Sequence, residues 1–311
     1  MGGFSEIGSR QHRRVTVLAV GGTGESFDGD RRRAVTGMLR GVTEGLDDRF
    51  DCRWIGYPAS YGPAPHIGGI SYQRSLDIGM REVGSALRQT EGPVALIGYS
   101  QGAVVIRAAL HELGEASDPV LERVLAVGFV ADPHQPPGVV AGCEGWGVAG
   151  PGPALPATVP AHWVGTPDDM ICNATADSFL RDVADLTAGF AVGRVRSWMM
   201  QMWNILRHNS FQNADRTSPG LAQMSHDVGR LWSAGREVLG YLPGTIAWRG
   251  LVFRNRRGGR HTSYAREPYR RESWTDPDTT GCEALAAWLQ VCATFSDVGC
   301  AAEWGEVEFA A

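Results

Sequence analysis

The sequence predicts an α/β fold, built on a central parallel sheet of about five strands with helices on its faces. Short apolar runs alternate with longer segments of helical spacing up to about residue 165, which is the pattern of βαβ units. The runs are apolar at successive positions, as expected of strands that are covered by helices on both faces.

The expected elements follow from this alternation. We expect strands at 15–20, 52–57, 94–99, 124–130 and 162–165, and helices at 30–46, 72–88, 101–113 and 282–291. The alternation stops near residue 175, and the residues that follow have a mostly helical pattern rich in Met and Trp. We therefore expect one catalytic domain over residues 1–311, with a helical insertion at 177–245 that forms a lid or linker subdomain.

Composition excludes several classes of protein. Hydrophobic residues make up 43% and charged residues 20% of the 311 residues, which excludes a disordered or fibrous chain. The net charge is −5, so we expect no nucleic-acid partner. All 29 basic residues are arginine, and this excludes a P-loop lysine, a Schiff-base lysine and a Ser-Lys pair.

The sequence also predicts no cofactor and no metal. The six cysteines form no CxxC pair, and no two histidines lie within 17 residues of each other, so zinc-finger and HExxH patterns are missing. The N-terminus lacks the basic and apolar regions of a signal peptide, and the longest uncharged run, 145–167, contains five prolines. We expect free thiols, no export signal and no stable membrane insertion, and the oligomeric state is left open.

The motif Gly98-Tyr99-Ser100-Gln101-Gly102 fits G-x-S-x-G, the pattern of a nucleophile elbow. An apolar run leads into this short motif and a helical pattern leads out of it, which is the strand–turn–helix that an elbow requires. Such a turn strains the backbone of Ser100 and lifts its hydroxyl from the sheet edge. Gly98 and Gly102 would lack side chains where helix and strand approach closely. Ser100 is the predicted nucleophile.

A serine nucleophile needs a base, and the base needs an acid that orients it. In this type of site the chain order is Ser, then Asp or Glu, then His. His261 is the favoured base, because it lies in a polar loop ahead of the last helix, from which an imidazole can reach the sheet edge. For the acid, the residues alone leave Asp168 and Asp169, after the fifth strand, and Asp132, after the fourth.

Five motifs in order along the chain then resemble one family over nearly the whole sequence. They are Gly22-Thr23-Gly24-Glu25, Tyr57-Pro58-Ala59-Ser60-Tyr61-Gly62, Gly98-Tyr99-Ser100-Gln101-Gly102, Thr166-Pro167-Asp168-Asp169-Met170 and His261-Thr262-Ser263-Tyr264. Together they resemble the lysin B esterases of mycobacteriophages, which are cutinase-like α/β-hydrolases. The long gap between the fourth and fifth motifs, where small cutinases have a short one, is also similar to lysin B.

The resemblance implies which residues would act. In lysin B the acid is the aspartate directly before the Met of the fourth motif, and the base opens the fifth motif. This implies a triad of Ser100, Asp169 and His261, and the D-x-[IV]-C pattern of cutinases also selects Asp169 over Asp168. We expect the backbone N–H groups of Gln101 and Thr23 to form the oxyanion hole.

The resemblance also implies a substrate, the ester that joins mycolic acids to arabinogalactan in the mycobacterial envelope, or another long-chain lipid ester. The chain would be made in the host cytoplasm and act at the mycobacterial cell envelope during phage lysis. Met side chains provide adaptable apolar surface for long alkyl chains. The candidate substrate-lining residues are Tyr99, His134, Trp198, Met199 and Met202.

Other interpretations stay open. The insertion could pack its own core instead of facing lipid, and the seven arginines within residues 254–271 could form a solvated loop instead of contacting envelope phosphates. A general cutinase or lipase and a mycolyltransferase are the rival enzymes. A rival of another class is an inactive hydrolase fold that binds lipid or envelope.

Overall fold

The computed structural model describes residues 14–175, 245–248, 251–255, 258–269 and 277–296, and the single residues 178, 181, 184 and 200. At the centre of this part lies a five-stranded sheet of β1 (Val15–Val20), β2 (Phe50–Trp54), β3 (Val94–Tyr99), β4 (Val124–Val130) and β5 (Ala161–Val164). The strand order is β2-β1-β3-β4-β5, and all neighbouring strands are parallel. The predicted α/β fold with a five-stranded parallel sheet is confirmed.

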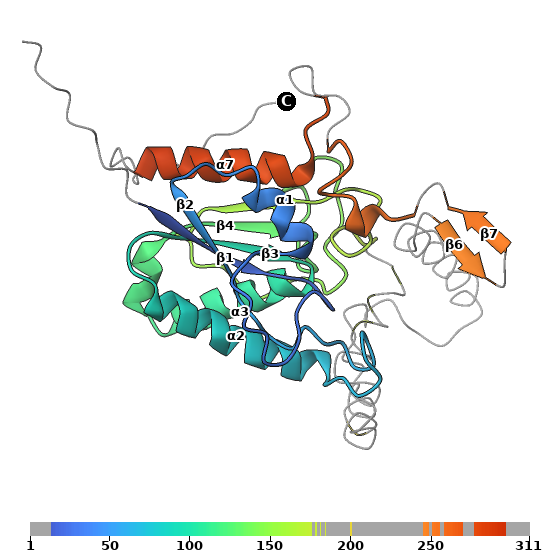
Figure 1. Cartoon of the computed structure of the whole chain (residues 1–311), viewed down its shortest axis with the longest axis horizontal. Coiled ribbons are helices and arrows are strands. Elements are labelled where there is room, and N and C mark those ends of the chain that lie inside the picture. Colours follow the sequence, from blue (N-terminus) through green and yellow to red (C-terminus); the bar gives the residue numbers. More distant parts are fainter. Residues whose placement is uncertain are drawn as a thin grey trace, which may run out of the picture.

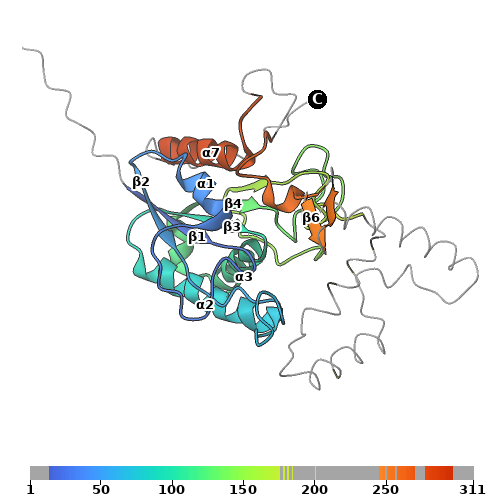
Figure 2. The ribbon, with the colours of Figure 1, turned by 45° about the vertical axis from the view of Figure 1, so that its right-hand side comes forward.

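Helices cover both faces of this sheet (Figures 1 and 2). α2 (Tyr72–Gln89) and α3 (Gln101–Glu115) pack side by side on one face. The short α1 (Arg40–Thr43) and the long α7 (Gly281–Ser296) lie together on the other face. A small antiparallel hairpin of β6 (Thr245–Trp248) and β7 (Leu251–Arg254) forms a second sheet, at a position where the sequence predicted no strand.

The two cores follow from the alternation of side chains along the strands. Val17 and Ala19 of β1 belong to the cluster that contacts α7, whereas Leu18 and Val20 belong to the cluster under α2 and α3. All of β1, β3 and β4 is buried except one half-buried residue, as two-sided coverage requires. A fully buried aliphatic side chain contributes about 1.5–3 kcal/mol, so the sheet is a firm base for the loops at its ends.

The predicted helix at 30–46 is mostly wrong. Only a 3₁₀ turn, Gly37–Leu39, and α1 form in this stretch. The chain before them is an ordered loop around Asp30, whose carboxylate accepts hydrogen bonds from Ser26 Oγ and Trp54 Nε1 and is paired with Arg32. These side-chain bonds compete with a helical first turn, as short acidic side chains commonly do.

The other boundaries differ by a few residues. The second strand runs from Phe50 to Trp54 instead of 52–57, and the last helix extends to Ser296. The insertion expected at 177–245, with Trp198, Met199 and Met202, lies almost wholly outside the described residues and stays a prediction. Among the helices that the structure describes, none is long and apolar enough to cross a membrane.

Candidate active site

The site lies where the strand order of the sheet reverses. β1 and β3 are neighbours, but their chains continue to opposite faces, and in open α/β sheets ligands bind beside the carboxyl ends of the strands at such a point. The loop after β1 reaches the end of β3 directly. A Cβ added to Gly22 would lie 2.8 Å from the ring of Tyr99 and 3.3 Å from Ser100 Cβ.

Ser100 forms the turn between β3 and α3. Its backbone has φ 52° and ψ −117°, a conformation that costs an L-residue about 1–3 kcal/mol. Its N–H donates to the Val130 carbonyl at 2.9 Å, which fixes the turn to the end of β4. A Cβ on Gly98 would lie 2.7 Å from Ala103 Cα, and one on Gly102 would lie 2.0 Å from the Val20 carbonyl oxygen. Both positions therefore need glycine for helix and strand to approach this closely.

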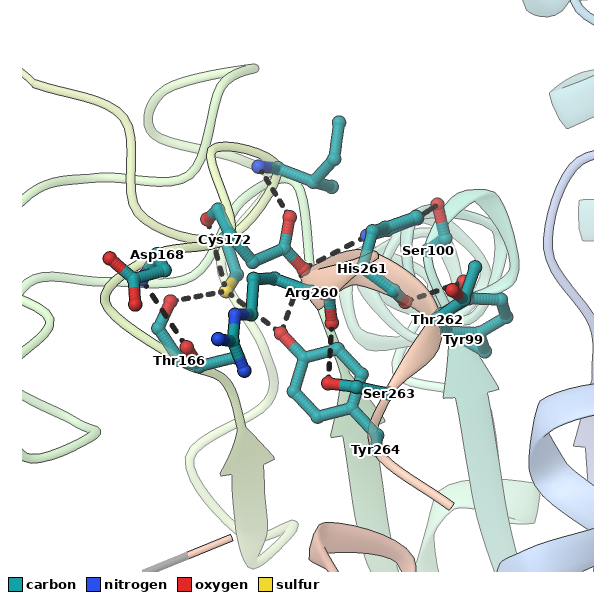
Figure 3. Close-up of polar contacts among 12 residues, drawn as sticks. Tyr99, Ser100, Thr166, Asp168, Cys172, Arg260, His261, Thr262, Ser263 and Tyr264 are labelled. Atoms are coloured by element: carbon teal, nitrogen blue, oxygen red, sulfur yellow. Dashed lines mark hydrogen bonds and ion pairs between the residues drawn. The ribbon is translucent and has the colours of Figure 1, made fainter. Parts of the chain in front are cut away.

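The structure brings Ser100, His261 and Asp169 together, and Figure 3 shows the His261 ring beside the Ser100 hydroxyl. His261 Nε2 lies 3.0 Å from Ser100 Oγ, and His261 Nδ1 lies 2.9 Å from Asp169 Oδ2. His261 comes from the 3₁₀ turn Arg260–Thr262, and Asp169 follows β5. Both side chains are buried, so their hydrogen bonds are sheltered from solvent.

Tyr99 contacts both the backbone and the ring of His261. Its hydroxyl donates to the backbone carbonyl of His261 at 2.8 Å, and the two rings stack with centroids 5.1 Å apart. The Tyr99 side chain is 6% exposed. These contacts give Tyr99 a role in positioning His261, and the expectation that Tyr99 lines the substrate stays a prediction.

Asp169 is a fully buried carboxylate with three donors. Oδ2 accepts from His261 Nδ1 and, at 2.7 Å, from the Tyr264 hydroxyl, while Oδ1 accepts from the Ile171 N–H at 3.0 Å. Burial alone would raise the pKa of Asp169, but the interaction with His261 and the bonds from Tyr264 and Ile171 outweigh it and lower the pKa. The acid is therefore ionised at neutral pH.

The backbone N–H groups of Gln101, directly after the nucleophile, and of Thr23, on the loop after β1, are the candidates for an oxyanion hole. Within the described residues, neither the N–H of Gln101 nor that of Thr23 donates a hydrogen bond. The Gln101 side chain ties the loops together, since its Oε1 accepts from Thr23 Oγ1 at 3.0 Å and its Nε2 donates to the Ser60 carbonyl at 3.1 Å. The Gln101 N–H also lies at the positive end of α3, which favours negative charge.

The competing acids lie elsewhere. Asp132 forms a buried ion pair with Arg107 at 2.6 Å and accepts from Trp163 Nε1 at 3.0 Å, so its charge is already matched. Asp168 is exposed, and its N–H donates to the hydroxyl of Thr166.

His134 is bonded through Nδ1 to the Gly150 carbonyl at 2.8 Å, and burial lowers the pKa of His134. These contacts favour a structural role for His134 over contact with substrate.

Sequence reasoning missed the supporting roles of two tyrosines, Tyr99 and Tyr264. Both belong to motifs that the sequence singled out, but nothing in the motifs shows which group each hydroxyl reaches. The five cysteines in the described part are free thiols. The described residues contain no cluster of three or more His, Cys, Asp or Glu side chains that could hold a metal ion.

A family model, the PE-PPE domain, matches residues 50–169, which is less than half of the chain. The matched segment runs from β2 to Asp169, so it contains Ser100 but ends before His261. No curated protein was found that matches the sequence.

Several solved structures show distant similarity. A cutinase-like protein from Cryptococcus sp. is 18% identical, with 51% of this chain and 79% of that protein covered and a TM-score of 0.38. The RedJ thioesterase from the prodiginine biosynthetic pathway in Streptomyces coelicolor is 18% identical over 39% of this chain and 40% of its own, with a TM-score of 0.26. A pyrethroid hydrolase from Sphingobium faniae JZ-2 is 19% identical over 42% and 44%, with a TM-score of 0.24.

Similarity this low says nothing about substrate, and the latter two matches span less than half of the solved proteins. The assignment of the fold depends on this chain's own geometry. Its strand order gives it an α/β fold, and the strained serine turn between β3 and α3 has the strand–turn–helix form of a nucleophile elbow.

Proposed function

We propose that the protein is a serine ester hydrolase that uses Ser100, His261 and Asp169. The observation that carries this proposal is the continuous chain of hydrogen bonds from Ser100 Oγ through the imidazole to a buried carboxylate. His261 Nε2 takes the proton of Ser100 Oγ as the oxygen attacks the ester carbonyl. Asp169 keeps the proton of His261 on Nδ1 and stabilises the imidazolium that forms.

The developing oxyanion is bound by the N–H groups of Gln101 and Thr23. These groups are held in place before substrate arrives, because the Gln101 side chain fixes the Thr23 loop against the elbow. Loss of one such donor typically lowers kcat by about 10²–10³-fold. Collapse of the tetrahedral intermediate returns the proton from His261 to the leaving alcohol, and an acyl-enzyme remains on Ser100 Oγ. Water, activated by the same imidazole, then releases the acid.

The finer part of the proposal is the substrate. The five motifs that resemble lysin B support the ester between mycolic acids and arabinogalactan, with the protein acting at the mycobacterial envelope in phage-mediated lysis of the host. Synthesis in the host cytoplasm belongs to the same proposal. A general cutinase or lipase on free acylglycerols would use the same three side chains, and so would a transferase that passes the acyl group to a sugar hydroxyl.

The chemistry is tested with para-nitrophenyl butyrate and with a fluorophosphonate that labels activated serines. Ser100→Ala should lower turnover by roughly 10⁴-fold or more and abolish labelling. Ser85→Ala is the matched control, because Ser85 lies on α2 and its hydroxyl accepts only from Gln89 within the described residues. An active Ser100→Ala variant would refute the mechanism, and an unlabelled wild type would favour an inactive lipid binder.

The substrate is tested by incubating purified protein with delipidated mycobacterial cell walls and identifying the released lipids by mass spectrometry. Free mycolic acids, absent with Ser100→Ala, are the expected product. Equal hydrolysis of added triacylglycerol in competition would favour a general lipase. Mycolyl sugars in place of free acids would favour a transferase.

A further inference from the structure

Tyr264 lies beside the proposed triad, three residues after His261 (Figure 3). Its hydroxyl donates to Asp169 Oδ2 at 2.7 Å, the same oxygen that His261 Nδ1 contacts at 2.9 Å. The side chain is 2% exposed, and the Tyr264 carbonyl accepts from the Cys282 N–H at the start of α7. The backbone of Tyr264 is thus bonded to the last helix, and its phenol is bonded to the acid.

The hydrogen bond from Tyr264 also stabilises the ionised form of Asp169. Asp169 is fully buried, and a buried carboxylate that lacks donors tends to take up a proton. Tyr264 and Ile171 are the two donors to Asp169 other than His261 that the described residues contain. Of these two, only the Tyr264 hydroxyl contacts Oδ2, so it shares the negative charge on the oxygen that attracts the imidazole proton.

We propose that Tyr264 is a positioning residue of the ester-hydrolase site, whose hydroxyl fixes Asp169 Oδ2 and limits the negative charge that this oxygen presents to His261 Nδ1. This inference rests on the proposed function of the same three side chains. By withdrawing charge from Oδ2, Tyr264 weakens the hold of Asp169 on the imidazolium. Without this donor, Asp169 would present a more basic oxygen to His261 Nδ1.

Other titratable groups near the pair do not replace this effect. Burial, followed by the charge of Asp169, raises the pKa of Tyr264 well above its usual value, so the phenol stays a neutral donor. Burial also raises the pKa of Cys172, whose Sγ lies 3.5 Å from the Tyr264 hydroxyl, and the thiol stays neutral. Among the described residues, the titratable groups beside the Tyr264–Asp169 pair are His261, Cys172, Cys143 and, next to the Tyr264 ring, Tyr269, and the charged residues of the same loop, Arg260 and Glu267, pair with each other.

The first test is the pH profile of kcat/KM for Tyr264→Phe with para-nitrophenyl butyrate. The acid limb of this profile, where kcat/KM rises with pH, reports protonation of the His261–Asp169 pair in the free enzyme. We expect this limb to move to higher pH by about 0.5–1 unit, because the carboxylate that has lost a donor holds the imidazolium more strongly. We also expect kcat to fall by about tenfold, with KM little changed.

Tyr57→Phe is the matched control. Tyr57 is also a buried tyrosine near the site, but its hydroxyl donates to the Gly21 carbonyl at 2.7 Å on the loop after β1, and not to Asp169. Its removal should leave the acid limb where it is in the wild type. If the limb moves equally in both variants, or in neither, Tyr264 has only a structural role and the inference is wrong.

A second variant decides the question even if Tyr264→Phe does not fold. Tyr264→3-fluorotyrosine keeps the ring and the hydroxyl but makes the phenol more acidic, and hence a stronger donor. The acid limb should then move to lower pH, opposite to its direction in Tyr264→Phe. No shift, or a shift to higher pH, would overturn the inference.

The rate of fluorophosphonate labelling of Ser100 against pH separates this inference from the proposed function, since it needs no ester substrate. If the wild type is labelled and the fluorotyrosine and phenylalanine variants shift the acid limb in opposite directions, both the proposed function and the role of Tyr264 are supported. A labelled wild type whose variants keep the same limb overturns only the role of Tyr264. A wild type that is not labelled overturns both.

Discussion

Gly102→Ala tests the tight approach of α3 to the end of β1. A Cβ at this position would lie 2.0 Å from the Val20 carbonyl oxygen and 2.6 Å from that of Gly21. Reaching even the shortest tolerated separation of 3.0 Å requires the two backbones to part by about 1 Å (3.0 − 2.0). Because backbone cannot rotate aside as a side chain can, we expect about 1–3 kcal/mol of destabilisation, as for overpacked cores.

The same movement separates the Gln101 N–H from the Thr23 loop. A misplacement of about 1 Å in a catalytic site can lower the rate 10²-fold. We therefore expect kcat/KM on para-nitrophenyl butyrate to fall by about 10² or more, measured beside urea unfolding and fluorophosphonate labelling. Gly84→Ala is the control, because an added Cβ there meets only the mobile end of Arg88 at 3.4 Å and lies within α2. It should keep full activity and gain up to about 1 kcal/mol. If Gly102→Ala keeps its turnover and its stability, the account of the elbow is refuted.

Further predictions concern the two buried aspartates and Tyr99. Asp169→Asn should lower turnover by about 10³–10⁴-fold while the protein stays folded, because an amide favours the wrong tautomer of His261; turnover and circular dichroism check this. Asp132→Asn should instead lower the free energy of unfolding by about 3–5 kcal/mol, since it leaves the buried Arg107 without its counter-charge. Turnover per folded molecule should be unchanged in Asp132→Asn, as active-site titration would show. The lowered pKa of Asp169 means that its carboxylate stabilises the fold fully above the ordinary aspartate pKa of about 3.9, and that this contribution is lost as pH falls through the lower folded value. Asp169→Asn should therefore lose Tm less steeply than wild type below about pH 4. Tyr99→Phe removes the bond to the His261 carbonyl and should lower the free energy of unfolding by about 1 kcal/mol, measured by urea titration.

The sheet could be predicted from the sequence because its strands are buried on both faces. The bounds of β1, β3 and β4 match the expected apolar runs, since nothing but burial decides them. The loop around Asp30 could not be predicted in the same way. Its residues have helical spacing, but the Asp30 carboxylate accepts hydrogen bonds from Ser26 and Trp54. Gly37 also takes a positive φ of 64°, which no α-helix has.

In the candidate site, too, some residues could be predicted from the sequence and others could not. Ser100 follows from a local pattern, the strand–turn–helix around a short motif. The choice of Asp169 over Asp168 needed the resemblance to a family, because both residues follow β5 directly. The contacts of Tyr99 and Tyr264 join segments 162 and 95 residues apart, and such pairings depend on the assembled sheet and on α7. Local patterns carry no information about which hydroxyl reaches which acceptor.

The backbone of Ser100 has a consequence for laboratory evolution. Glycine has no Cβ and adopts positive φ freely, so it would relieve the strain of this turn at φ 52°. A library that is screened by heat challenge alone will therefore enrich glycine at position 100 and lose the nucleophile. Selection for a more robust variant must score turnover and heat resistance in the same round, because at this position the two favour different residues.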